Sequence, residues 1–446
     1  MSQRCLTSLA VLLVIVGSFT LLATMSYAAD KRAEADANLE AIVVGNTEFA
    51  FNLYARLKDH PDVKKANGNL FFSPYSISTA LAMTYAGARG RTAEQMAVVL
   101  QLPFEQDLVH DERGPNKPRP LMAVRLPWET RRLAASFGAL EKGLKAEPKE
   151  SGYELNIANA LWGQKGYKFL QSFLDLNRKY YGAGLEQVDF VRETEKARKT
   201  INKWVEKQTK DRIKDLIPRG AVDPLTVLVL TNAIYFKGDW ASKFKEENTE
   251  HADFHVNEYK TVEVPMMYQK GKFAYTEGED TQTLVLPYKG DELSMLIVLP
   301  KKIGLLSSFE SELTAKSLTF EQGRLREREV RVYLPKFKMT CGVLELKDIL
   351  KDMGMKDAFS LPPADFSGMT GVKDLFISKV LHKAFVEVNE EGTEAAAATA
   401  VVMTRGGPRP APVFRADRPF VFMIRDNRSA SILFMGRIVN PAEQVE

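Results

Sequence analysis

The sequence predicts an α+β protein in which most helices precede most strands, and three observations support this. Apolar residues recur at helical spacing in the first half of the chain, as at Ile77, Leu81 and Tyr85. In the second half, short apolar runs are bounded by turn-forming residues, which is typical of strands. No repeat period and no long linker interrupts the chain from Glu48 onward. We therefore expect one mixed domain, although 446 residues would by length alone suggest about three.

Two helices are expected between residues 73 and 100. Ser73-Pro74 places a capping hydroxyl before a proline that suits a first turn. Thr92 and Gln95 have the spacing of a capping box, in which the Gln95 amide reaches back to the Thr92 backbone. A third helix is expected within residues 197–217, where apolar residues at helical spacing lie in a basic stretch. Its basic face should be solvated.

Strands are expected in the second half. Residues 227–236 form a nearly unbroken apolar run, which indicates a central strand buried on both faces. Residues 284–286 and 296–299 flank a polar turn, and so do residues 420–424 and 432–434, so both pairs are predicted to be hairpins. The turn of the second hairpin contains the sequon Asn427-Arg428-Ser429, and we expect a glycan at Asn427 on the surface.

The N-terminus has the features of a secretory signal peptide. Arg4 precedes an apolar run over residues 9–22, and Ser26-Tyr27-Ala28 is a small-x-small cleavage pattern. The alternative is a signal anchor, although the run is short for a bilayer span. We expect residues 1–28 to be removed and residues 29–446 to be secreted as an extracellular protein.

Histidine and cysteine are scarce, which limits the possible chemistry. The whole chain has five histidines and two cysteines, and removal of the signal peptide leaves Cys341 alone. The mature chain then has no internal disulfide and too few ligands for zinc-finger or iron–sulfur sites. Burial of a large apolar core must stabilise it. The formal net charge is only +4, and we expect neither a nucleic-acid nor a membrane partner.

Sequence signatures of enzymes are absent. The chain has no Gly-x-Ser-x-Gly elbow, Walker loop, His-Glu-x-x-His motif or dinucleotide fingerprint. His251 and His255 are four residues apart, but the residues around them alternate as in an exposed strand. Acid and base pairs of carboxylates are recognised by a geometry that a sequence does not reveal. We expect no catalytic residues, no metal and no bound cofactor.

Residues 390–405 have an unusual alternation. Every second residue from Thr393 is small or apolar, and Glu394, the only charge after Thr393 and before Arg405, lies on the other parity. No proline occurs from Gly392 to Gly407, so a central position in a sheet is open to this segment. As a strand it would offer one face for burial. The alanines also suit a surface helix followed by a loop, which is the alternative interpretation.

With these segments the sequence resembles the serpin family over nearly the whole mature chain. The matching segments are the hinge that begins at Glu390 and, along the chain, residues 69–78, 232–240, 334–337, 414–422 and 434–441. The resemblance implies a single serpin domain over residues 29–446, with three β-sheets and eight or nine helices. It also implies an exposed reactive loop over residues 390–413.

The resemblance implies a suicide inhibitor of a serine protease. The protease cuts the loop as a substrate, and the cut loop inserts as a strand of the main sheet before the acyl-enzyme is hydrolysed. A charge at Thr393, Ala395 or Ala397 would oppose that insertion, and the sequence has none there. The alternative within the family is a non-inhibitory carrier or storage protein. Family members are usually monomers, and we expect a monomer here.

The resemblance also assigns positional roles. The hinge contains Glu390, Gly392, Thr393, Ala395 and Ala397. The group called the breach, at the top of the main sheet, contains Trp240, Lys336 and Glu390. The group called the shutter, at the centre of that sheet, contains Ser73, Ser76, Asn232 and His382. In this interpretation His382 is a buried partner that controls sheet opening, not a catalytic base.

The scissile bond follows from the length of the loop. Fourteen residues on from Gly392, the family's usual count, places Gly406 before the bond, and a loop shorter by one residue places Arg405 there. We predict cleavage of Arg405-Gly406, because a guanidinium can pair with the buried carboxylate in the pocket of a trypsin-like protease. Gly406-Gly407 and Met403-Thr404 remain alternatives, and the latter would suit a protease with an apolar pocket.

Residues 113–132 are basic and rich in proline, and we expect an exposed insertion there. Some serpins bind heparin through a basic helix in this part of the chain. The segment has no helical stripe of basic residues. This absence weakens the case for heparin binding. The basic charge of the segment nevertheless leaves a heparin-like glycosaminoglycan open as a cofactor or additional partner, and it is the only one we consider.

Overall fold

The computed structural model describes residues 32–65, 67–108, 123–145, 152–340, 342–391 and 410–443. The predicted signal peptide, residues 1–28, and Cys341 lie outside these ranges. Within them, no helix combines the length and the apolar character that a membrane crossing requires.

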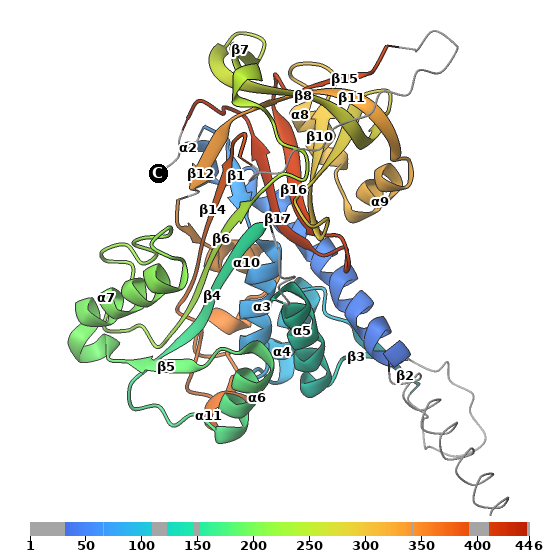
Figure 1. Ribbon diagram of the computed structural model, residues 1–446. Helices are drawn as coiled ribbons and strands as arrows, with labels where there is room; N and C mark the ends of the chain where they lie inside the picture. The colour runs from blue at the N-terminus through green and yellow to red at the C-terminus, as the bar shows by residue number, and fades with distance from the viewer. Residues whose placement is uncertain are drawn as a thin grey trace, which may run out of the picture.

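Two large sheets and a small hairpin organise the described residues (Figure 1). The nine-stranded sheet has the order β1-β17-β16-β10-β9-β8-β11-β15, with β7 paired to β8, and the six-stranded sheet has the order β12-β14-β6-β4-β5, with β13 paired to β14. The strands of the nine-stranded sheet are β1 (Leu70–Phe72), β7 (Glu250–His255), β8 (Thr261–Glu277), β9 (Thr281–Pro287), β10 (Leu293–Pro300), β11 (Arg326–Pro335), β15 (Val413–Arg415), β16 (Phe420–Asp426) and β17 (Ile432–Ile438). Those of the six-stranded sheet are β4 (Tyr153–Gln164), β5 (Leu185–Val188), β6 (Leu228–Gly238), β12 (Phe337–Thr340), β13 (Leu344–Glu345) and β14 (Lys379–Val388). The hairpin is formed by β2 (Phe104–Leu108) and β3 (Ala123–Pro127).

Helices and sheets together confirm the α+β class. Many helices gather around the lower end of the six-stranded sheet, whereas α8 and α9 lie beside the nine-stranded sheet (Figure 1). In the described ranges the helices are residues 32–57, α2 (Pro61–Lys65), α3 (Pro74–Tyr85), α4 (Gly90–Val99), α5 (Thr130–Lys145), α6 (Gln171–Tyr181), α7 (Phe190–Gln208), α8 (Leu306–Glu312), α9 (Ala315–Gly323), α10 (Lys347–Asp352) and α11 (Ser367–Thr370), with short 3₁₀ turns at Glu246–Asn248 and Asp357–Phe359. The number exceeds eight or nine because short helices such as α2 and α11 are included.

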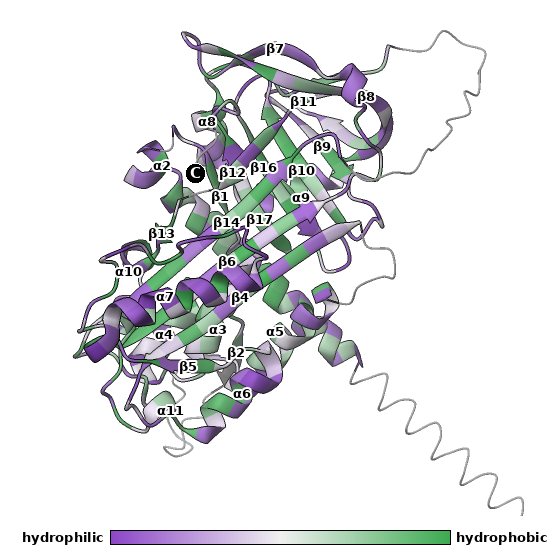
Figure 2. Ribbon diagram, turned by 60° about the vertical axis from the view of Figure 1, so that its left-hand side comes forward, coloured by the Kyte–Doolittle hydropathy of each residue, from purple (hydrophilic) through white to green (hydrophobic). Residues whose placement is uncertain are grey.

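Strand β6 is buried on both faces, which confirms the sequence prediction. One side of the strand contributes Leu230, Ile234 and Phe236 to the main core shared by both large sheets. The other side contributes Val229 and Tyr235 to a second apolar cluster beneath α7. Figure 2 shows α7 lying across β6 and β4, with many hydrophilic residues along its length. The predicted helix with a solvated face is thus confirmed, and it ends at Gln208.

Helix α3 begins where the sequence predicts. The Ser73 side chain accepts a hydrogen bond from the Ser76 N–H at 3.1 Å, and all residues of the helix are buried. The two predicted hairpins are also present, as β9–β10 and β16–β17. Burial along α3 is so complete because the helix packs between β17, β6 and β4.

The capping box predicted at Thr92 is wrong. Helix α4 begins at Gly90, and the Arg89 side chain makes no capping hydrogen bond. The Thr92 hydroxyl instead accepts from the Asp365 N–H at 3.0 Å, and the Gln95 side chain accepts from the Asp357 N–H at 2.8 Å. Both polar groups therefore fasten a distant loop to the helix, a use that local spacing does not reveal.

The predicted insertion over residues 113–132 lies partly outside the described residues. In its last part, residues 123–132, β3 and the first residues of α5 form regular structure. The Arg132 guanidinium lies 3.8 Å above the Trp128 ring and donates to Asn38 Oδ1 at 2.7 Å. This basic side chain is therefore engaged within the fold.

Candidate functional site in the six-stranded sheet

The centre of the six-stranded sheet is a parallel pair of strands. β14 and β6 pair from Lys379 opposite Val229 to Val386 opposite Phe236. Their outer neighbours, β12 and β4, run antiparallel to them. A strand that lay antiparallel to β14 would therefore also be antiparallel to β6. Inserting one there would replace one parallel ladder by two antiparallel ladders, which are slightly more stable per residue.

The ladder between β14 and β6 ends before the strands do. β14 continues to Val388 against β12, and β6 continues to Gly238 against β4, without a pairing of these ends to each other. The chain leaves β14 at this same end and re-enters described structure near β15, in the other sheet. The start of the predicted reactive loop thus lies beside the point where the pair would open.

The three predicted breach residues meet at this end of the sheet. Lys336 is the single residue between β11 and β12, where the chain crosses from one large sheet to the other. Its Nζ lies 2.6 Å from Glu390 Oε2, two residues after β14. Trp240 Nε1 donates to the Asn389 carbonyl at 3.0 Å, and its ring stacks on Tyr288 with centroids 4.6 Å apart.

Glu390 is held as a buried carboxylate. Only 5% of the residue is exposed, and besides Lys336 it accepts from the Thr249 hydroxyl at 2.7 Å. Burial raises the pKa of Glu390, but the hydrogen bonds and charge of these partners outweigh burial and leave the pKa below its ordinary value. The charged form therefore anchors the first residues of the loop against the sheet.

The shutter residues form a row across three strands. Asn159 of β4, Asn232 of β6 and His382 of β14 are direct neighbours in the sheet register. The N-terminus of α3 lies against this row and supplies two serines. Ser76 Oγ accepts from Asn232 Nδ2 at 2.6 Å and donates to Asn159 Oδ1 at 2.9 Å. Ser73 N–H donates to His382 Nε2 at 3.1 Å.

His382 is neutral in this arrangement. Because Nε2 accepts the Ser73 N–H, its proton is on Nδ1, which faces Asn232 Oδ1 at hydrogen-bond distance. Burial lowers the pKa of His382 to about 3, and the contact with Asn232 opposes that shift only in part. A neutral imidazole thus joins β14 both to β6 and to α3, which holds the parallel pair closed.

Asn159 is the member of this cluster that sequence reasoning missed. Its Nδ2 donates to the Ser76 carbonyl at 3.3 Å and its Oδ1 accepts from Ser76 and Asn232. The one signal in the sequence is a polar residue within the apolar run of residues 157–162. A half-buried asparagine within an apolar strand needs partners, and that requirement could have marked it.

The remaining predicted positions fall into two groups. The hinge residues after Glu390 and the scissile bond lie outside the described residues; these are Gly392, Thr393, Ala395, Ala397, Arg405 and Gly406. Asn427 is exposed in the turn between β16 and β17, and its Nδ2 donates to the Asp291 carbonyl at 2.8 Å. A glycan at Asn427 would replace one of the two hydrogens on this nitrogen and leave the other to donate.

Comparisons with known proteins agree with this geometry. A family model described as Serpin (serine protease inhibitor) matches residues 44–441. The chain is 42% identical over 411 residues to the leukocyte elastase inhibitor of Homo sapiens, covering 90% of this chain and 100% of that protein. It is 41% identical over 429 residues to an uncharacterized serpin-like protein of Thermococcus kodakarensis, covering 96% of this chain and 91% of that protein.

Solved structures give the same result. Uncleaved ovalbumin superimposes with a TM-score of 0.76 at 31% identity and covers 90% of this chain and 100% of its own. Human thyroxine-binding globulin in complex with thyroxine superimposes with a TM-score of 0.74 at 33% identity, and the match covers 91% of this chain and 100% of the globulin. The matched residues 44–441 include the breach and the shutter cluster. The chain therefore belongs to the serpin family.

Proposed function

We propose that this serpin is an inhibitor that traps a serine protease as a covalent acyl-enzyme. The observation that carries the proposal is the direct pairing of β14 with β6, followed along the chain by a hinge whose alternate residues from Thr393 carry no charge. The protease serine attacks the carbonyl of the residue before the scissile bond, forms an ester and releases the amine of the next residue. The freed loop then inserts between β6 and β14 before water hydrolyses the ester.

The length of the hinge segment fits this step. Residues 393–405 would span about 43 Å as a strand at about 3.3 Å per residue. β6, along which they would lie, has 11 residues and by the same rise spans about 36 Å. The inserted segment would thus reach from one end of β6 to the other, and an ester at its far end would be carried along the length of that strand.

The proposed target is a trypsin-like protease, cut at Arg405-Gly406. An arginine before the scissile bond matches a pocket that contains a carboxylate. The relative named leukocyte elastase inhibitor makes the second bond, Met403-Thr404, the relevant competitor, because methionine would suit an apolar pocket. The two bonds are close enough that one loop could serve either protease.

Incubation with trypsin, and separately with leukocyte elastase, tests both parts. An inhibitor gives a band on a denaturing gel near the summed masses of protease and serpin. The N-terminus of the released fragment should begin at Gly406 after trypsin. Arg405→Ala should abolish the trypsin complex, whereas the matched variant Met403→Ala should keep it. A fragment that begins at Thr404 with trypsin would refute the arginine assignment.

The alternative function within the family is that of a carrier. A cavity of about 260 Å³ lies between the helix of residues 32–57, α9 and β16, and Nε of Arg425 at its wall is buried without a hydrogen-bond partner among the described residues. Thyroxine-binding globulin, a similar fold, is known with thyroxine bound. A carrier mixed with trypsin would give only a clipped chain and no covalent band.

Secretion as a glycosylated monomer is part of the same proposal. Expression of the full chain in a secreting eukaryotic cell should place a protein in the medium that begins at Ala29 and carries a glycan at Asn427. Intact-mass spectrometry before and after glycosidase measures both features. A product retained in the cell with Met1 intact would contradict secretion, and sedimentation of the secreted form at twice its mass would contradict the monomer.

A heparin-like polyanion is proposed as an accelerator through the basic segment of residues 113–132. The expected result is a rate of protease inhibition that rises with heparin and falls again as salt screens the contact. A rate that heparin leaves unchanged would remove this cofactor from the proposal.

A further inference from the structure

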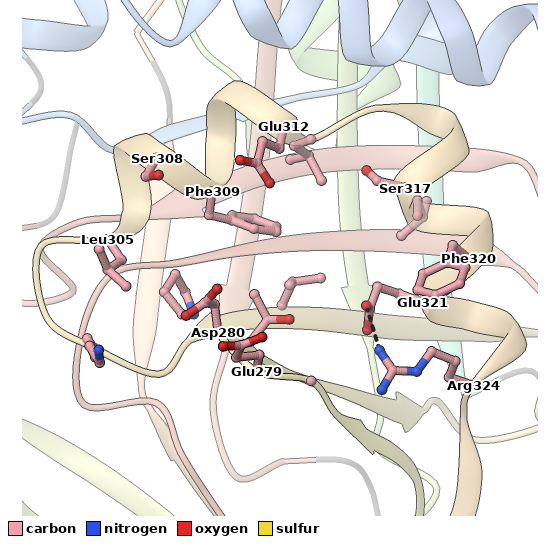
Figure 3. Close-up of a pocket in the computed structure, with 17 residues that line it drawn as sticks. Glu279, Asp280, Leu305, Ser308, Phe309, Glu312, Ser317, Phe320, Glu321 and Arg324 are labelled. Atoms are coloured by element: carbon pink, nitrogen blue, oxygen red, sulfur yellow. Dashed lines mark hydrogen bonds and ion pairs between the residues drawn. The ribbon is translucent and has the colours of Figure 1, made fainter.

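A cavity of about 550 Å³ lies between the turn that joins β8 to β9 and the helices α8 and α9 (Figure 3). Its volume falls within the range of about 300–1,000 Å³ that is usual for small-molecule sites. None of its lining residues belongs to the breach or to the shutter cluster. The trapping mechanism therefore gives no reason for this cavity.

One part of the cavity wall is apolar. α8 and its flanking positions contribute Leu305, Phe309 and Leu313, which are all half-buried. In Figure 3 the Phe309 ring extends into the space beneath α8. Phe320 on α9 lies at another side of the cavity and is 66% exposed. A large aromatic side chain exposed next to a half-buried apolar wall offers a surface for an apolar ligand.

The rest of the wall is acidic. Glu279 and Asp280 come from the turn between β8 and β9, Glu312 ends α8, and Glu321 lies on α9. Glu321 pairs with Arg324 at 3.4 Å, whereas the other three carboxylates form no ion pair within the described part of the chain. Four acidic residues thus line the cavity against two basic ones, Lys302 and Arg324. The charge favours a cation and disfavours an anion.

The carboxylates are arranged for an extended ligand and not for a metal ion. In the ranges that the structure describes, no three His, Cys, Asp or Glu side chains are placed to hold a metal. In the view of Figure 3, Glu312 lies above the Phe309 ring and Asp280 below it, so the acidic groups are on opposite sides of the aromatic ring. An ion would contact one of them, whereas an organic molecule can span the distance.

We propose that this cavity binds a small organic cation with an aromatic or branched aliphatic body. The body packs between Phe309 and Phe320, and the ammonium group pairs with a carboxylate on one side of the Phe309 ring, that of Asp280 or that of Glu312. Attraction between the cation and the faces of the two aromatic rings adds to the binding. The residues that line the site, 278–324, are not part of the predicted reactive loop of residues 390–413, so the proposal does not depend on whether the serpin traps a protease.

Two fluorescent probes that share one ring system test the charge requirement. Dansylcadaverine carries a free amine and dansylglycine a free carboxylate. Titrated into the full-length, uncleaved protein, the amine probe should bind one to one with a Kd at least tenfold below that of the acid probe. Raising the salt from about 0.02 M to about 0.5 M should raise the Kd of the amine probe, because exposed charges are screened. Equal affinities of the two probes would overturn the proposal.

Substitution of carboxylates that line the cavity tests whether the amine probe binds there. The double variant Asp280→Asn with Glu312→Gln should raise the Kd of the amine probe about threefold to tenfold. The matched control removes two exposed carboxylates outside the cavity, Glu250→Gln with Glu327→Gln, and should leave the Kd unchanged.

The aromatic part of the wall has its own pair of variants. Phe320→Ala should raise the Kd about fivefold or more, and Tyr259→Ala, which removes an aromatic residue that is 96% exposed elsewhere, should not. Both residues are exposed, so the fold should persist, and an unchanged unfolding temperature verifies it. A control that weakens binding as much as its partner, or an unaffected Phe320→Ala, would place the probe elsewhere and overturn the proposal.

Discussion

At the residue scale, two buried groups of different charge link β14, or the chain just after it, to neighbouring elements. His382 is kept neutral by burial, and Glu390 is kept charged by Lys336 and Thr249 despite burial. His382 joins β14 to Asn232 on β6 and to Ser73 at the start of α3. Glu390, just after β14, pairs with Lys336 where the chain crosses between the two large sheets. Changes of single charges there should therefore be measurable as changes in the stability of the closed form.

The first prediction concerns pH. The pKa of His382 is about 3 in the folded protein, below its ordinary value of 6.5, so between these values the unfolded chain binds a proton that the folded chain does not. The stabilisation that neutral His382 contributes to the free energy of unfolding is therefore fully present above pH 6.5. It is lost as the pH drops toward 3, by at most about 1.4 kcal/mol per pH unit. Urea midpoints between pH 7.5 and 4.5 measure this loss. His382→Gln should flatten the pH dependence and His255→Gln should not; equal slopes in all three proteins would contradict it.

The second prediction concerns the breach. Lys336→Met leaves the Glu390 carboxylate buried beside an apolar side chain, and we expect a loss of about 1–2 kcal/mol in the free energy of unfolding. The loss is smaller than for a fully buried pair because 38% of the Lys336 side chain is exposed. Urea denaturation compares it with Lys260→Met, which removes an exposed lysine. An equal effect of both variants would show that the ion pair contributes nothing.

Single residues also mark the limit of what the sequence could predict. Local spacing identified Ser73 as a cap correctly, because a cap and its partner lie within one turn. The same reasoning failed at Thr92 and Gln95, whose partners lie some 260 to 270 residues away. Asn159 was missed for the same reason: its partners Ser76 and Asn232 are brought to it only by the tertiary fold.

Strand pairing is the feature that matters at the element scale. The sequence predicted β6 as a central strand and the two hairpins, because apolar runs and turns are local patterns. It could not show that β14 pairs directly with β6, since the register of a parallel pair depends on contacts between distant segments. The resemblance to serpins, and not periodicity, placed the hinge beside that pair.

The third prediction tests insertion of the hinge by its parity. Thr393→Arg places a charge on the alternate positions that are otherwise small or apolar, and burying it would cost several kcal/mol. The variant should be cleaved as a substrate with little or no stable complex. Glu394→Arg is the matched control, because it puts the same residue on the opposite parity, and it should still form complex. The yield of the denaturing-gel band measures both, and equal yields would exclude insertion in this register.

The fourth prediction belongs to the whole molecule. If the cut loop becomes a strand between β6 and β14, the cleaved protein exchanges one parallel ladder for two antiparallel ladders and gains apolar contacts with the cores on both faces of the sheet. Its unfolding temperature should then exceed that of the intact protein by at least about 10 °C, as measured by far-UV circular dichroism. Cleaved Thr393→Arg should not show the increase. A cleaved wild-type protein that melts at or below the intact one would contradict loop insertion.

The position of β16 and β17 determines what becomes of the chain after the cut. A break at Arg405-Gly406 leaves a C-terminal fragment that carries β15, β16 and β17. β16 pairs with β10 and β17 pairs with β1, so two strands of the fragment lie inside the nine-stranded sheet and not at its edge. No covalent bond retains the fragment, yet its departure would split the core. The cleaved serpin should therefore migrate as one particle on a native gel and as two chains only after denaturation.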